Sequence, residues 1–262
     1  MKIYKLFKIK NYLNIIKILI NFLFSKFTNK NKFLNQQINN FHNLGWNYDI
    51  SLKKLNNILM ANQFEEFDDS KISMASQHLV AFCAINNNPK RILEIGTFDG
   101  STAFLLSKIF PHAEVITIDL DDNSNEFQNT YNRSNKKYRE DFLIQRKNNI
   151  NNDRIRFIQD NSFNIQNYNL MKFDLIWIDG DHNYPVLAWD ICNSFHLLNE
   201  NGFLLCDDIY FHKSDAHNVL NYLNKEKILK TDYILKRVSN IFSANPFIKK
   251  HIAIIKKTKS IL

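Results

Sequence analysis

The sequence predicts an α/β protein built on a doubly wound, mostly parallel sheet. From about residue 70 onward, short apolar runs typical of buried strands alternate with stretches of helical periodicity. Only five glycines occur, and four of them lie at the edges of these runs, where a tight turn or a close backbone approach requires them. With 262 residues, 45% of them hydrophobic, the chain is long enough for one sizeable core plus an appendage.

Each expected element follows from its own stretch of sequence. The run SMASQHLVAFCAIN predicts a helix over 73–86, ahead of a first strand, RILEIG, over 91–96. Further along, the alternation predicts helices over 101–110 and 185–198 and strands over 113–120, 154–160, 173–180 and 202–209. A helix near 215–228 and strands over 233–238 and 251–257 then supply an antiparallel hairpin at one edge. The expected architecture is Rossmann-like, with an N-terminal helical extension in front of it.

The extension is expected to cover residues 1–70, and the main domain residues 71–262 with an insertion over 121–153. The stretch LNIIKILINFLF (13–24) predicts an amphipathic helix, too short and too interrupted for a membrane span. Lysines surround it, so residues 1–30 could lie on an anionic membrane surface as a peripheral contact. Packing on its own domain or on a second copy, in a homo-oligomer, is the equal alternative. Residues 31–68 are expected to form a helical lid or arm.

Charge and cysteine content exclude few classes of function, but they indicate the cellular compartment. The formal charge of +8 is spread along the chain and concentrates mainly at the two ends. The three cysteines, Cys83, Cys192 and Cys206, show no C-x-x-C spacing, which indicates neither a disulfide framework nor a zinc site. A reducing, cytoplasmic location fits best, and the three thiols are expected to be buried and inert.

The ends of the predicted strands are strongly acidic, and there an open α/β sheet binds its ligands. They run EIGTFDGS, IDLDD, QDNS, IDGDH and CDDI. A nicotinamide dinucleotide is disfavoured, because Phe98 takes the second glycine position of its fingerprint and Ser101 the third. A P-loop is disfavoured as well, since no GK[ST] follows the turn. The turn therefore suits a ligand without phosphates.

S-adenosylmethionine is such a ligand, and each of its groups has an expected partner. The backbone at the two glycines of the turn and the start of the next helix suit its methionine portion. Acids at the ends of the first and fourth strands suit the ammonium, and the acid ending the second strand suits the ribose diol. Residues ending the second and third strands suit the adenine. The expected cofactor site comprises Glu94, Gly96, Thr97, Phe98, Gly100, Ser101, Asp119, Leu120, Asp160, Asn161 and Asp179.

On these motifs, residues 73–257 resemble the class I S-adenosylmethionine-dependent methyltransferases. The block RILEIGTFDGSTAFLL…AEVITIDL is similar to the family's first two motifs. WIDGDHNY with LLNENGFLLCDDI resembles the metal-dependent small-molecule O-methyltransferases, above all those acting on sugar hydroxyls of macrolides and, more distantly, the catechol and caffeoyl-CoA enzymes. The resemblance implies that Asp179, Asp207 and Asp208 are divalent-metal ligands and that His182 is the general base. It does not extend to residues 1–70, and the 121–153 insertion departs from the family pattern.

The chemistry of these residues agrees with that reading. Three carboxylates at the ends of two adjacent strands would form an oxygen-rich site suited to Mg²⁺, which lowers the pKa of a bound hydroxyl and orients it. His182, three residues beyond Asp179, could then remove the hydroxyl proton during attack on the sulfonium methyl. The sequence thus predicts a metal-assisted O-methyltransferase for a small-molecule or sugar acceptor.

Two other classes of function compete with this prediction. The basic insertion NKKYREDFLIQRK and the positive net charge favour a nucleic-acid methyltransferase, but IDGDH stands where base-amino methylators usually carry N/D-P-P-Y/F. Nucleic acid is therefore not the expected partner. A non-catalytic interaction protein that keeps the fold is the third candidate, and the intact strand-end acids disfavour it.

Overall fold

The computed structural model describes residues 30–68, 77–211, 214–238 and 249–257. Seven strands form one sheet in the order β3-β2-β1-β4-β5-β7-β6. Strands β1 (Arg91–Ile95), β2 (Glu114–Asp119), β3 (Ile155–Gln159), β4 (Phe173–Ile178) and β5 (Leu198–Ile209) are parallel to one another. Strand β7 (Lys249–Lys256) is antiparallel to β5 and to β6 (Thr231–Val238), which lies at the edge. The Rossmann-like sheet with a closing antiparallel hairpin is confirmed.

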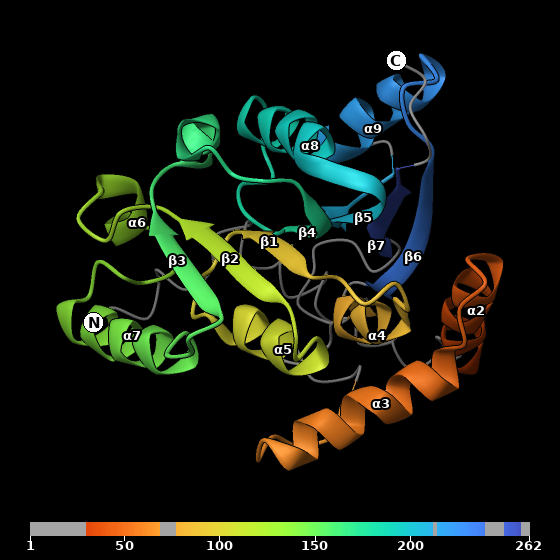
Figure 1. Cartoon of the computed structure of the whole chain (residues 1–262), viewed down its shortest axis with the longest axis horizontal. Coiled ribbons are helices and arrows are strands. Elements are labelled where there is room, and N and C mark those ends of the chain that lie inside the picture. The colour runs from red at the N-terminus through yellow and green to blue at the C-terminus, as the bar shows by residue number, and fades with distance from the viewer. Residues whose placement is uncertain (1–29, 69–76, 212–213, 239–248, 258–262) are drawn as a thin grey trace, which may run out of the picture.

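Helices cover both faces of the sheet, as a doubly wound fold requires (Figure 1). Helices α3 (Tyr48–Ala61), α4 (Gln77–Ala84) and α5 (Ser101–Ile109) pack on one face. The short 3₁₀ helix η1 (Ser162–Tyr168) and helices α8 (Val186–Leu197) and α9 (Asp215–Lys225) pack on the other. Each face carries its own buried apolar cluster, and the sheet separates the two.

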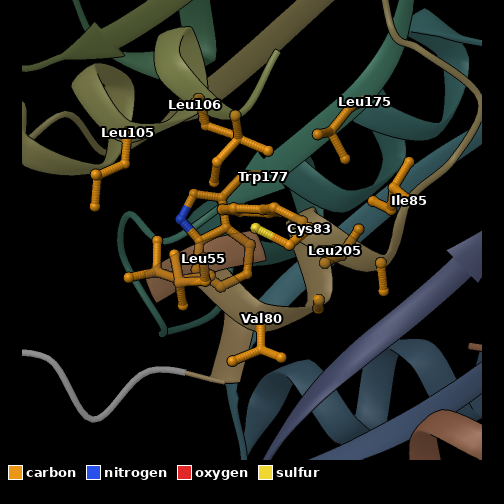
Figure 2. Packing of buried hydrophobic residues seen from close by; sticks show 14 of the residues in the cluster. Leu55, Val80, Cys83, Ile85, Leu105, Leu106, Leu175, Trp177 and Leu205 are labelled. Carbon is orange, nitrogen blue, oxygen red and sulfur yellow. The ribbon is translucent and has the colours of Figure 1, made fainter. Parts of the chain in front are cut away.

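The core of the first face is built around Trp177 of β4. This side chain is fully buried, and Figure 2 shows it among Leu55, Cys83, Leu106 and Leu205, which come from α3, α4, α5 and β5. Because Trp177 shares one buried cluster with residues of three helices and a neighbouring strand, its burial helps to join the helical layer to the centre of the sheet.

Two segments decorate this core. The 121–153 insertion forms helices α6 (Asn125–Asn129) and α7 (Lys136–Asn149) beyond the β2–β3 edge. Helix α2 (Lys30–Asn43) lies beside the opposite edge strand, β6 (Figure 1). The expected amphipathic helix over 13–24 falls outside the described residues, and the domain boundary near residue 70 stays a prediction.

One expectation about the core is wrong. Cys83 and Cys206 are buried, but Cys192 is exposed. It lies on α8 next to the buried Ile191, so the apolar run around it turns one side to the sheet and the other to solvent.

Candidate active site

The glycine-containing turn joins β1 to α5 at the carboxyl edge of the sheet. Gly96, Phe98 and Gly100 all have positive φ, at 100°, 49° and 76°. Gly100 caps α5 without a side-chain hydrogen bond, and Ser101 begins the helix. The backbone N–H of Phe98 donates to Asp119 Oδ2 at 2.7 Å, which ties the turn to the end of β2.

Contacts within the chain explain why the two glycines are needed. A Cβ at Gly96 would lie 2.3 Å from the main-chain oxygen of Asp179, and one at Gly100 would lie 2.6 Å from Ile150 Cγ2. The sequence argument assigned both glycines to close approach of the methionine portion of a ligand. In the structure each glycine also lets one part of the chain pack directly on another, and the contact with a ligand stays a prediction.

Behind the turn lies a buried polar chain. Thr97 and Thr117 share a hydrogen bond of 2.6 Å, and Thr117 Oγ1 donates to Glu94 Oε2 at 2.6 Å. Glu94 is fully buried, its Oε1 has no hydrogen-bond partner among the described residues, and burial raises its pKa to about 8. Glu94 is therefore mostly protonated at neutral pH and supports the turn from within the sheet.

Asp119 ends β2 and faces the turn. Its two carboxylate oxygens accept from the backbone N–H groups of Phe98 and Leu120, each bond shorter than 3 Å. Burial raises the pKa of Asp119, and these two N–H groups and the nearby Arg133 oppose that shift. Leu120 itself is half-buried. Each carboxylate oxygen can accept a second hydrogen bond, so Asp119 keeps capacity for a polar ligand.

The insertion packs against this turn. The Phe98 ring is exposed on one side and forms edge contacts with Tyr131 and Phe142, at centroid distances of 5.3 and 5.1 Å. Asn149 Nδ2 of α7 donates to the carbonyl oxygen of Asp99 at 2.8 Å. Aromatic residues of the 121–153 insertion thus line the turn beside Asp119.

Asp160 and Asn161, at the end of β3, make mainly local contacts. Asp160 Oδ2 accepts from the Tyr168 hydroxyl at 2.7 Å, and this bond is the main reason why the pKa of Asp160 is lowered. Asn161 Oδ1 accepts from the backbone N–H of Phe163 at 3.0 Å and caps η1. In the structure both side chains therefore stabilise the turn after β3.

A second group of acids lies beyond β4 and β5. His182 Nε2 is 3.7 Å from Asp179 Oδ1 and 3.9 Å from Asp208 Oδ2, and the imidazole is half-buried. Burial, and then the negative charge of Asp207, raise the pKa of Asp179 well above its usual range. The structure thus brings together the four residues that the sequence predicts there, Asp179, His182, Asp207 and Asp208.

The two groups meet at one point of the backbone. The N–H of Asp179 donates to the carbonyl oxygen of Ile95 at 2.8 Å, and the N–H of Gly96 donates to that of Ile118 at 2.9 Å. Gly96 and Asp179 are therefore side by side, so a ligand seated on the glycine turn would have its reactive end close to His182.

Two lysines, which the sequence argument missed, neutralise the second group. Lys236 Nζ donates to Asp207 Oδ2 in a very short contact and to Asp208 Oδ1 at 3.3 Å, and Lys250 Nζ donates to Asp208 Oδ2. Burial alone would raise the pKa of Asp207, but the Lys236 ammonium outweighs burial and lowers it to about 2. No local pattern reveals the role of Lys236, because it is reached only through the pairing of β6 with β7 and of β7 with β5.

His78 is a third residue that the sequence argument missed. It lies on α4 and packs on Trp177, with ring centroids 4.6 Å apart. Burial lowers its pKa to about 3, against the attraction of Asp207. His78 thus presents a neutral imidazole to the inner side of the acid group.

The acid group does not fit a divalent metal. Among the described residues, no group of three His, Cys, Asp or Glu side chains could hold a metal ion. Both oxygens of Asp208 and one of Asp207 already face lysine ammonium groups. The expected Mg²⁺ site is therefore not supported, because cations of the chain itself occupy the ligand oxygens.

No helix within the described ranges is long and apolar enough to cross a membrane. The expected membrane contact through residues 1–30 lies almost wholly outside those ranges.

Comparison with known proteins finds a match for the centre of the chain. Residues 93–209, from β1 to the end of β5, match the family model described as a methyltransferase domain. No curated protein sequence matches the chain. These residues include the glycine turn, Asp119, His182 and the three acids of the second group.

Solved structures of low identity are similar to the chain. An O-methyltransferase from Bacillus cereus in complex with SAH is 16% identical, with a TM-score of 0.46, over 79% of this chain and 90% of that one. The O-methyltransferase TomG from Streptomyces achromogenes, involved in tomaymycin synthesis and in complex with SAM, is 15% identical, with a TM-score of 0.46, over 83% and 94%. A methyltransferase from Pyrococcus furiosus is 20% identical, with a TM-score of 0.43, over 64% and 74%.

Proposed function

We propose that the chain is an S-adenosylmethionine-dependent O-methyltransferase acting on a hydroxyl of a small-molecule or sugar acceptor, and the match of residues 93–209 to the methyltransferase-domain model supports this proposal. One observation carries the proposal: His182 lies within 4 Å of two carboxylates, beside the turn that closes β1. A base held between acids suits removal of a hydroxyl proton, and the adjacent turn suits the methyl donor.

The cofactor would lie along the carboxyl edge of β1 and β2. Asp119 would accept hydrogen bonds from a ribose diol, and the exposed face of Phe98 with Leu120 would offer apolar contact. Glu94, fully buried, would act through Thr117 and Thr97, which hold the turn. When bound, S-adenosylmethionine supplies an electrophilic methyl group on a cationic sulfur. Asp160 and Asn161 would contribute through the shape of the turn after β3.

His182 is the proposed general base. Its Nε2 faces Asp179 and Asp208, so Nδ1 would accept the acceptor's hydroxyl proton while the two carboxylates stabilise the imidazolium that forms. With its proton removed, the acceptor hydroxyl would be able to take the methyl group that bound S-adenosylmethionine would supply. Holding the two reactants in line supplies much of the rate enhancement.

Isothermal titration calorimetry tests whether the chain binds S-adenosylmethionine, and a purified protein that binds none of it would refute the function. Transfer of label from methyl-labelled cofactor into a cell extract tests whether the chain methylates an acceptor, and it identifies that acceptor. His182→Asn should lower kcat by about 10²- to 10⁴-fold with unchanged cofactor affinity. His196→Asn is the matched control, because His196 lies on α8 at the end remote from the site. Equal turnover in the two variants would remove His182 from the mechanism.

A further inference from the structure

The sheet has a β-bulge at Asp207 and Asp208 and a second one at Lys236, the lysine that contacts both acids. Between the pairs Cys206–Ala253 and Ile209–His251, two residues of β5, Asp207 and Asp208, stand opposite one residue of β7. Asp208 also has a φ of 55°, which is uncommon for a residue other than glycine. A bulge re-aims side chains that a regular strand would leave on alternate faces. The bulge therefore directs neighbouring carboxylates toward a common place.

A matching bulge lies on β6, across β7. Leu235 pairs with His251 and Arg237 with Lys250, so Lys236 is the extra residue. Strands two places apart in a sheet are separated by roughly 10 Å, a gap that requires a long side chain. The Lys236 side chain crosses it, is only 9% exposed, and meets both carboxylates.

Helix α2 holds the lysine bulge from outside the sheet. Gln37 Nε2 donates to the carbonyl oxygen of Lys236 at 3.2 Å, and the N–H of Leu235 donates to Asn40 Oδ1 at 3.0 Å. Lys249, next to Lys250, donates from Nζ to Gln36 Oε1 at 2.9 Å. Side chains of one helix thus satisfy backbone groups that the bulged edge strand leaves unpaired.

The lysines occupy the positions that a metal ion would need. Mg²⁺ requires oxygen ligands at about 2.0–2.1 Å in octahedral geometry. Lys236 contacts Asp207 Oδ2 and Asp208 Oδ1, and Lys250 contacts Asp208 Oδ2. Among the oxygens of these two acids, only Asp207 Oδ1 has no hydrogen-bond partner within the described residues. A dication here would have to displace two ammonium groups and then lie beside them.

We propose that this transferase works without a divalent cation, and that Lys236, assisted by Lys250, is the positioning residue that holds Asp207 and Asp208 beside His182. A covalently attached cation has a fixed place and charge, and chelation cannot remove it. The inference rests on the proposed function for its turnover measurement only, since metal binding is measured independently of activity.

Electron paramagnetic resonance of Mn²⁺ tests the binding claim on the full chain, with and without S-adenosylmethionine. The signal of free Mn²⁺ should be undiminished by the wild-type protein. Lys236→Ala combined with Lys250→Ala vacates the carboxylate oxygens, so this variant should bind Mn²⁺ and melt at a higher temperature when it is present. Lys256→Ala is the matched control, because Lys256 is on the same strand with its Nζ over the Phe203 ring. Wild-type binding of Mn²⁺ that Asp207→Asn abolishes would overturn the inference, even if the double variant does not fold.

Turnover gives a second, separate test. EDTA should leave methyl transfer by the wild-type protein unchanged, whereas a loss of transfer that Mg²⁺ restores would overturn the inference. Lys236→Met should lower kcat by about 10²-fold with little change in KM for the cofactor, because the acids beside His182 lose their alignment. Lys236→Arg, which keeps the charge, should recover part of that loss. A protein that fails to bind S-adenosylmethionine refutes the proposed function, and the Mn²⁺ result still decides the inference.

Discussion

Comparing Gly96→Ala with Gly45→Ala should separate the cost of backbone strain from the cost of a steric clash. Gly96 has a φ of 100°, and a Cβ there would lie 2.3 Å from the main-chain oxygen of Asp179. Gly45 also has a positive φ, 73°, but a Cβ there would meet nothing within 4 Å. The pair therefore compares backbone strain plus a clash with backbone strain alone.

The expected magnitudes follow from these distances. For Gly45→Ala the strain is about 1–2 kcal/mol, offset by up to about 1 kcal/mol because alanine restricts the unfolded chain. For Gly96→Ala the Cβ is roughly 1 Å inside an ordinary C···O contact of about 3.3 Å, so the ends of β1 and β4 must separate. Strain of about 1–3 kcal/mol and overpacking of about 1–3 kcal/mol together predict a loss of about 2–6 kcal/mol. That is a large part of the 5–15 kcal/mol typical of a domain.

Urea denaturation followed by tryptophan fluorescence measures both variants, with linear extrapolation to water. Gly100→Ala extends the series, because its Cβ would meet the Ile150 side chain at 2.6 Å, and a side chain yields more readily than backbone. The expected order of destabilisation is Gly45→Ala, then Gly100→Ala, then Gly96→Ala. If Gly96→Ala cost no more than Gly45→Ala, the packing of the turn on Asp179 would not be the reason for glycine at position 96.

Three further predictions concern single sites. Between pH 5 and 8 the folded state keeps a proton on Glu94 that the unfolded state releases, because the pKa is raised to about 8 from 4.5. Stability therefore falls as pH rises, by at most about 1.4 kcal/mol per pH unit from this group, and Glu94→Gln should remove that part of the slope in urea titrations. Native protein should react with Ellman's reagent at Cys192 alone, slowly because burial raises the pKa of this thiol, and unfolded protein at all three thiols. Asn40→Ala should cost about 1–2 kcal/mol, because it removes the acceptor of the Leu235 N–H, and a smaller loss would mean that water replaces the side chain.

Much of the fold can be predicted from the sequence, because buried parallel strands are recognisable as short apolar runs. The order of the last strands does not, since β7 inserts between β5 and β6 through pairings that no local pattern encodes. The bulges at Asp207–Asp208 and at Lys236 depend on those pairings. Local reading could therefore find the acids but not their counter-charges.

The acids that end the parallel strands differ in the contacts they make. Asp119 and Asp160 both end a parallel strand and look alike in sequence. Asp119 takes the backbone N–H of Phe98, 21 residues away, whereas Asp160 takes the hydroxyl of Tyr168, eight residues on, and joins a local turn. Whether such an acid faces the ligand-binding edge of the sheet or caps its own loop depends on which hydrogen-bond donors lie near it in the folded chain. The types of the neighbouring residues do not specify these donors. Glu94 shows a third outcome, burial within the sheet.

The position of β7 between β5 and β6 also has a consequence for the order of events during synthesis. Domains generally fold as units while the ribosome adds about 5–20 residues per second. Asp207 leaves the ribosome 29 residues before Lys236, and Gln37, which holds the Lys236 carbonyl, is 199 residues away from it. A nascent chain that ends before β7 therefore has an open sheet edge at β5, lacks Lys250, and has no strand to pair β6 and its Lys236 with the sheet. The candidate active site is therefore completed only when helix α2, synthesised early, meets the last two strands described.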